Sequence, residues 1–316
     1  RCCRDEQARF ERFASALSAE IASYAGVEAG SVNTLYIGGG TPSVLDISQM
    51  RDIMTAVKES FCVKPGAEMT IEANPGTLGR KDGVMLAKLQ AYKYLGFNRL
   101  SMGVQSMDND RLHYLGRIHT AENVARDMEL IRRKGFENVN LDLIFSVPGE
   151  STEDALSDLK KVLDLRPEHV SCYSLQIEEG TPFGRMAEAG ELTEVSDEED
   201  RRTYHEICRT LKEAGYEHYE ISNFARLPEY RSQHNSLYWN MDDYMSFGPG
   251  AHSSIGNLRY SFVKDLKQYI YGVHKKISII DEYEQIDPME RAVEYIMLGM
   301  RTNRGISEYD YRTKCQ

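Results

Sequence analysis

Short apolar runs alternate with amphipathic stretches along the first half of the chain. Five runs have the composition of buried strands and recur every 31 to 39 residues, at 34–37, 68–75, 99–105, 138–145 and 169–176. Stretches with helical periodicity lie between them, near 46–60, 80–95, 121–134 and 152–164. This rhythm predicts right-handed β-α-β units that carry a parallel sheet, either open or closed toward a barrel.

The chain on either side of this repeat has patterns of its own. Residues 5–25 place apolar side chains three or four positions apart, which predicts an amphipathic helix packed on the core. Ser196 begins a capping-box motif, so we expect a helix there, followed by one more strand over 217–224. Beyond that strand the rhythm breaks into a glycine-punctuated segment with a hairpin through Phe262. A last clear helix begins at Asp287.

These patterns predict an α/β chain in three parts. Residues 1–185 form a partial barrel, and residues 186–280 form a flanking lobe of helix, strand and hairpin. Residues 281–316 begin a C-terminal helical domain. Its helix carries an apolar face that needs a covering partner, so we expect this domain to be truncated.

Three consecutive glycines follow the first predicted strand, within the stretch 34–42. Because glycine has no Cβ, a ligand can approach this backbone closely. A tight strand-to-helix connection, with Thr41 as the cap and Pro42 in the first turn, explains the same residues. The glycine cluster alone identifies no chemistry.

Polar residues lie at or near the carboxyl ends of all five strands. They are Gly38 to Thr41, Glu72, Asn74, Gln105, Asp142, Gln176 and Glu178. Taken singly, Glu72 and Asp142 are compatible with solvated strand ends, and Gln105 with a side chain that only bonds a turn. Because the carboxyl ends of parallel strands share one edge, the set favours a common ligand site at the mouth of a barrel-like sheet.

Composition narrows the classes of partner. The 316 residues are 41% hydrophobic, enough for a buried core, and the formal net charge of -11 repels phosphate backbones. Nucleic acid is therefore not an expected partner. No apolar run reaches membrane-spanning length, no signal-peptide pattern opens the chain, and the six cysteines have no disulfide-framework spacing. We expect a cytoplasmic protein.

Seven segments, taken in order, resemble the radical S-adenosylmethionine family. They lie at 36–42, 71–75, 99–106, 141–145, 179–182, 234–239 and 250–253. The resemblance covers nearly the whole chain and is specific to the branch of oxygen-independent coproporphyrinogen III oxidase and HemW, a heme chaperone. It implies a partial (β/α)6 TIM-like barrel of the radical SAM type with a smaller C-terminal lobe.

The resemblance also implies which residues contact S-adenosylmethionine. The matching positions are Gly39, Gly40, Thr41, Glu72, Gln105, Arg117 and Asp142. The chemistry suits that ligand, because carboxylates accept hydrogen bonds from ribose hydroxyls or an amine and a guanidinium forks onto a carboxylate.

The cysteine triad CxxxCxxC of that family is absent from this sequence. In the family it holds three irons of a [4Fe–4S] cluster, and the fourth iron binds S-adenosylmethionine. Cys2 and Cys3 are adjacent and cannot reproduce the spacing. We expect the triad and the first barrel strand to belong to the full-length protein. The favoured explanation of their absence is that the sequence is truncated or only partly resolved. A misassigned start and a natural loss of the cluster are the alternatives.

The resemblance leaves the activity, and whether the chain is an enzyme, open. The segment 234–239 favours a HemW-like protein that binds S-adenosylmethionine and heme, with His234 and His252 as candidate iron ligands. An ordinary hydrogen-bonded histidine explains His234 equally well, and His252 is the weaker candidate of the two. The alternative is the oxidase, which decarboxylates coproporphyrinogen III to protoporphyrinogen IX. A cluster-less barrel with a structural role is a second alternative.

The implied partners are a tetrapyrrole, either heme or coproporphyrinogen III, and an electron donor. Membrane contact is expected only through a heme acceptor.

Overall fold

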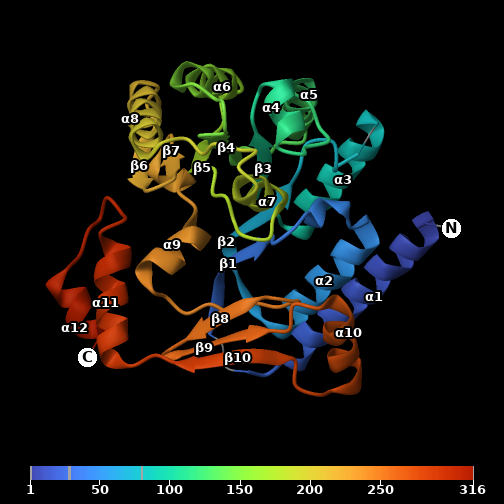
Figure 1. Cartoon of the computed structure of the whole chain (residues 1–316). Helices are drawn as coiled ribbons and strands as arrows, with labels where there is room; N and C mark the ends of the chain where they lie inside the picture. Colours follow the sequence, from blue (N-terminus) through green and yellow to red (C-terminus); the bar gives the residue numbers. More distant parts are fainter. Residues whose placement is uncertain (1, 28–29, 80, 316) are drawn as a thin grey trace.

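A curled seven-stranded sheet organises the protein (Figure 1). The computed structural model describes residues 2–27, 30–79 and 81–315. The strand order is β1-β2-β3-β4-β5-β7-β6. Five strands run parallel: β1 (Ser31–Ile37), β2 (Cys62–Ala73), β3 (Arg99–Gln105), β4 (Val139–Phe145) and β5 (His169–Ser174). Two short strands, β7 (Asn223–Ala225) and β6 (Glu217–Glu220), continue the sheet in antiparallel pairing.

Helices cover the outer face of this sheet (Figure 1). The long ones are α1 (Cys2–Ser23), α2 (Ile47–Ser60), α3 (Asp82–Leu95), α5 (Ala121–Arg133), α6 (Thr152–Asp164) and α8 (Asp197–Glu213). The shorter helices are η1 (Pro42–Val44) and η2 (Pro228–Tyr230), which are 3-10 helices, and α4 (Asn109–Tyr114) and α7 (Pro182–Glu188). Asp46, Thr120 and Ser151 close capping boxes that fix where three of the long helices begin. None of the helices in the described residues has both the length and the apolar character of a membrane span.

A second lobe follows the seven-stranded sheet. Helix α9 (Gln233–Asn240) leads to an antiparallel sheet of β8 (His252–Ile255), β9 (Leu258–Phe262) and β10 (Ile280–Gln285), with α10 (Leu266–Lys275) between the last two strands. Helix α10 packs against α1. The chain then forms α11 (Pro288–Gly299), which contacts α9, and α12 (Glu308–Cys315).

The two faces of the seven-stranded sheet differ in polarity. The outward side chains of the strands join the helices in one apolar core, which includes Ile71, Leu100 and Leu141. The alternate side chains of the same strands are buried and polar. They include Glu68, Thr70, Arg99, Ser101, Asn140, His169, Ser171 and Asn223. A polar interior of this kind places hydrogen-bonding groups inside the curve of the sheet, where a ligand can use them.

The predicted parallel strands, the intervening helices and the hairpin through Phe262 are confirmed. The strand expected over 217–224 differs, because the chain turns at Ile221 and Ser222 and pairs with itself as β6 and β7. The capping box expected at Ser196 is one-sided: Ser196 accepts from the Glu199 amide, while the Glu199 carboxylate pairs with Arg202. The division into three domains stays a prediction.

Candidate functional site

The carboxyl ends of β1 and β2 meet at the Glu72 carboxylate. The Tyr36 hydroxyl donates to Oε1 at 2.7 Å, and the Gly39 amide donates to Oε2 at 3.2 Å. Gly38 leaves the room for this arrangement, since a Cβ there would lie 2.6 Å from both side chains. Burial raises the pKa of Glu72, although the two hydrogen bonds act in the opposite direction. The glycine loop is thereby tied to the second strand.

The next two strands contribute Gln105 and Asp142. Gln105 is buried and has a φ of 69°, a left-handed conformation that turns the chain sharply at the end of β3. The Asn140 amide donates to Asp142 Oδ1 at 2.6 Å, and the Ser101 hydroxyl approaches Oδ2 at 3.5 Å. Burial raises the pKa of Asp142 to about 6 against hydrogen bonds from Asn140 and Ser171, and the negative charge of Glu72 adds to the rise.

Thr41 and Arg117 complete the predicted set. The Asn74 amide donates to Thr41 Oγ1 at 3.0 Å, which ties the end of the glycine loop to β2. Arg117 is partly buried, and its Nε has no hydrogen-bond partner among the described residues. Burial lowers the pKa of Arg117 and the nearby Asp142 carboxylate raises it. The Arg117 guanidinium is therefore within electrostatic range of Asp142 and keeps one donor without a partner.

The predicted residues thus gather at one end of the sheet. Gly39 bonds Glu72 directly, and the charges of Glu72 and Arg117 both act on Asp142. Gly40 lies in open surroundings, because nothing lies within 4 Å of the position that a Cβ would take there. The result is a polar mouth with carboxylate acceptors, a guanidinium with an unused donor and accessible glycine backbone, which suits a zwitterionic ligand with hydroxyl groups.

The two candidate histidines occupy different surroundings. His234 is partly buried in α9: its ring stacks on Tyr36 at 4.9 Å, Nδ1 bonds the Thr34 hydroxyl at 3.0 Å and Nε2 bonds Tyr238 at 2.9 Å. Burial lowers the pKa of His234 to about 4, so the ring is neutral at pH 7. His252 is exposed at the start of β8. Only His234 of these two is linked to the strand ends, through Tyr36.

Two residues that hold the site carboxylates in place, Tyr36 and Asn140, were not predicted as site residues. Tyr36 precedes the glycines, and Asn140 lies two positions before Asp142 on the same face of β4. Strand alternation could have identified Asn140. No local signal pairs Tyr36 with Glu72, because their strands are joined only by the sheet.

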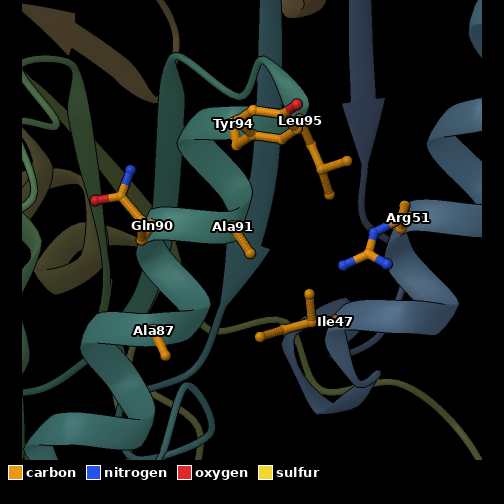
Figure 2. Close-up of a pocket in the computed structure, with 7 residues that line it drawn as sticks. All are labelled: Ile47, Arg51, Ala87, Gln90, Ala91, Tyr94 and Leu95. Carbon is orange, nitrogen blue, oxygen red and sulfur yellow. The ribbon is translucent and has the colours of Figure 1, made fainter.

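A surface groove lies elsewhere on the molecule. It has a volume of about 290 Å³ and is lined by α2 and α3 residues, including Ile47, Arg51 and Tyr94 (Figure 2). These helices cover the outer face of the sheet. The groove is therefore separate from the strand ends.

Comparison with known proteins identifies the family. The family model described as "Radical SAM superfamily" matches residues 7–162. A protein of Lactococcus lactis called "Heme chaperone HemW" is 34% identical over 297 residues, which cover 93% of this chain and 76% of that protein. The chain belongs to the HemW family of radical SAM proteins.

Further comparisons support this placement. The HemW protein of Bacillus subtilis is 34% identical over 90% of this chain and 73% of its own length. The HemW protein of Escherichia coli is 37% identical over 71% of this chain and 56% of its own length. The structure of the coproporphyrinogen III oxidase HemN from Escherichia coli, described as a radical SAM enzyme, superimposes with a TM-score of 0.81 at 25% identity, covering 94% of this chain and 70% of that one. The predicted family and radical SAM fold are confirmed.

Membership of the HemW family implies S-adenosylmethionine and a [4Fe–4S] cluster, and the residues fit the two groups differently. The unused Arg117 nitrogen and the glycine backbone fit S-adenosylmethionine. The cluster finds no matching ligands: Cys62 is exposed, Cys172 and Cys315 are buried, and the described residues contain no group of three side chains able to hold a metal. The side chains of Cys2 and Cys3 lie outside the described residues. The side chains that the structure describes therefore do not account for the cluster.

Proposed function

We propose that the strand ends bind S-adenosylmethionine through Gly39, Gly40, Thr41, Glu72, Gln105, Arg117 and Asp142. The observation that carries the proposal is the Arg117 Nε without a hydrogen-bond partner, at a mouth where the Asp142 charge acts on Arg117 and where Glu72 and open glycine backbone also lie. A carboxylate of the ligand satisfies Arg117, and its amine and ribose hydroxyls satisfy the acidic residues.

The residues present have distinct tasks in this proposal. Glu72 and Asp142 accept hydrogen bonds and offset the positive charge of the sulfonium. Tyr36 and Asn140 hold those carboxylates in place at 2.7 and 2.6 Å. Bound S-adenosylmethionine supplies the 5'-deoxyadenosyl group that the family uses for radical chemistry. The chain's own contribution is binding, orientation and exclusion of water.

Calorimetric titration with S-adenosylmethionine tests this assignment. Asp142→Ala is expected to cost about 1.5–3 kcal/mol of binding, the range for a hydrogen bond to a charged group. Asp164→Ala is the control, because Asp164 is exposed at the end of α6 and away from the strand ends. Equal affinity of the Asp142 variant and the unaltered chain would contradict the proposed site.

We further propose that the protein carries heme, as the names of its relatives state for them, and that His234 is the iron ligand. A neutral imidazole is the form that binds iron, and burial keeps His234 neutral at pH 7. Tyr238 is 39% exposed and occupies Nε2, so it must turn outward when iron binds. Tyrosine rotation at the surface is inexpensive, so this step leaves the site usable.

Spectroscopic titration with heme tests the carrier role. His234→Ala is expected to abolish the Soret shift of specific binding, and Tyr238→Phe to preserve or tighten binding because Nε2 is freed. His252→Ala distinguishes the second candidate, and His113→Ala, an exposed histidine of α4, is the control for surface binding. Loss of binding in the His252 variant alone would move the ligand to β8.

The oxidase remains the second candidate, and the fold shared with HemN favours it. It predicts decarboxylation of coproporphyrinogen III in step with formation of 5'-deoxyadenosine, in protein that holds a cluster under anaerobic reducing conditions. Turnover without specific heme binding would favour the oxidase over the carrier.

A further inference from the structure

A chain of buried polar side chains crosses the interior of the sheet from α9 to Asp142. The Ser232 amide contacts the Tyr219 hydroxyl at 3.1 Å, and that hydroxyl contacts His169 Nε2 at 2.7 Å. His169 Nδ1 contacts Asn140 Oδ1 at 2.6 Å, and the Asn140 amide contacts Asp142. Ser232 and His169 are fully buried, and Asn140 and Tyr219 are 2% and 4% exposed.

The Asp142 end of this series and the neutral His169 ring fix the direction of its hydrogen bonds. The Ser232 backbone N–H can only donate, so the Tyr219 oxygen accepts from it, and a neutral His169 ring with its proton on Nδ1 accepts from the Tyr219 hydroxyl at Nε2. An ionised Asp142 can only accept, so Asn140 turns its NH₂ toward that carboxylate. The Asn140 carbonyl then faces His169, whose Nδ1 must carry the proton. His169 is thereby held as one neutral tautomer.

We propose that His169 is a positioning residue for Asp142, which it orients through Asn140, and that the same chain ties Asp142 to the first turn of α9. Asn140 also contacts the Ser101 hydroxyl at 2.8 Å and the Ser171 hydroxyl at 3.1 Å, but a hydroxyl can donate or accept. Of these partners, His169 with its proton on Nδ1 therefore selects the orientation that gives Asp142 its 2.6 Å donor. Ser232 caps α9 only two residues before His234. The importance of this coupling for ligand binding rests on the proposed function, whereas the hydrogen-bond direction does not.

The surroundings keep His169 neutral while Asp142 titrates. Burial, with a contribution from the Arg99 charge, holds the pKa of His169 well below its usual range. Burial also raises the pKa of Asp142 to about 6, and the charges of Glu72, Arg99 and Arg117 act on the same carboxylate. Loss of the Asn140 donor should therefore change the titration of Asp142 and leave His169 uncharged.

Nuclear magnetic resonance of the full chain tests the direction of the hydrogen bonds without any ligand. Histidine ¹⁵N shifts are expected to show His169 neutral with its proton on Nδ1 between pH 6 and 8. A proton on Nε2, or a charged ring, would overturn the proposal. This measurement needs no variant to fold.

Carboxyl ¹³C titration of Asp142 tests the positioning role. Tyr219→Phe removes the donor to His169 together with the acceptor of the Ser232 amide, and it is expected to raise the Asp142 midpoint by roughly half a pH unit. Asn140→Ala removes the direct donor and should raise it by about one unit. The control is Tyr216→Phe, because Tyr216 is also a buried tyrosine but donates to the Pro167 carbonyl. Equal midpoints in the Tyr219 and Tyr216 variants would overturn the proposal.

Binding of S-adenosylmethionine to the same proteins separates positioning from general damage. If Asp142 binds when ionised, Tyr219→Phe should weaken binding about twofold at pH 6 and leave it nearly unchanged at pH 8. Equal weakening at both values would indicate a merely structural effect and contradict positioning. If the unaltered chain does not bind S-adenosylmethionine, the proposed function fails, and the magnetic resonance result still decides the hydrogen-bond chain.

Discussion

Two partly buried carboxylates, one near the end of β2 and one within β4, hold charge at a cost to folding. Glu72 and Asp142 both have raised pKa values, and burial is the first cause for each. Their hydrogen-bond donors, Tyr36 and Asn140, reduce that cost without removing it. Groups of this kind are typical of binding sites, where the ligand supplies the missing partner.

Asp142→Asn is expected to stabilise the folded protein and to weaken its ligand binding. A raised carboxyl pKa means that folded-state stability falls as pH rises from about 4 to about 6, because the folded state holds its proton longer than the unfolded chain. The neutral variant escapes this loss, so a gain of about 1 kcal/mol is expected at pH 7.5, after allowance for solvent screening. Urea unfolding at pH 4 and 7.5 measures it. A variant less stable than the unaltered chain at pH 7.5 would contradict the burial argument.

Gly38 and Gly40 should respond differently to alanine. A Cβ at Gly38 would lie 2.6 Å from Glu72 and Tyr36, whereas nothing lies within 4 Å of one at Gly40. Gly38→Ala is therefore expected to destabilise the protein by about 1–3 kcal/mol through overpacking, and Gly40→Ala by less than about 1 kcal/mol. Thermal unfolding of the two variants compares them directly. Similar losses would mean that loop flexibility, rather than the Glu72 contact, limits both positions.

Helix α9 depends on a buried strand residue for its start. Glu68 of β2 accepts from the Gln233 and His234 amides at 3.0 and 2.9 Å, and Ser232 accepts from the Asn235 amide. A carboxylate at a helix N-terminus satisfies unpaired N–H groups and complements the helix dipole. The position of His234 against Tyr36 therefore depends on Glu68.

Glu68→Gln is expected to destabilise the protein by about 1–2 kcal/mol, because a neutral amide accepts the two backbone donors less strongly. Faster hydrogen exchange of the α9 amides should accompany the loss. Glu213→Gln, an exposed position at the end of α8, is the control. Unchanged exchange in α9 would show that Ser232 alone fixes the helix start.

A second buried carboxylate, Glu20, joins the second lobe to helix α1. Glu20 of α1 is 4% exposed, accepts from the Gly248 amide at 2.9 Å and takes a short hydrogen bond from Tyr269 of α10. Burial raises the pKa of Glu20, and these donors oppose the rise. The contact holds the glycine-punctuated loop that leads to His252.

Tyr269→Phe is expected to cost about 2 kcal/mol, because Glu20 keeps its buried carboxylate and loses its side-chain donor. Denaturant unfolding measures the cost, and limited proteolysis should cut the loop before β8 more readily. Tyr271→Phe on the same helix is the control, since Tyr271 is 59% exposed. Equal proteolysis of the two variants would mean that the lobe is held by its apolar contacts instead.

Hydrophobic periodicity and the polar residues at the strand ends were sufficient to predict the helices, the strands and the parallel direction of five strands. Residues 152–164 became α6 and residues 99–105 became β3 with the expected bounds. Both patterns are local, because a strand alternates every two residues and a helix repeats every 3.6. The same logic places Glu72 and Gln105 at the ends of β2 and β3, whereas Asp142 lies in the middle of β4.

The partners of those residues depended on how the sheet curls. Glu68 meets an amide 166 positions away, Thr34 meets His234 across 200 positions, and Tyr219 reaches His169 across 50. No periodic pattern encodes such pairs, because they form only when the curl of the sheet brings distant strands and α9 to one interior. The break between β6 and β7 has the same origin, since the chain turns where pairing with β5 becomes available.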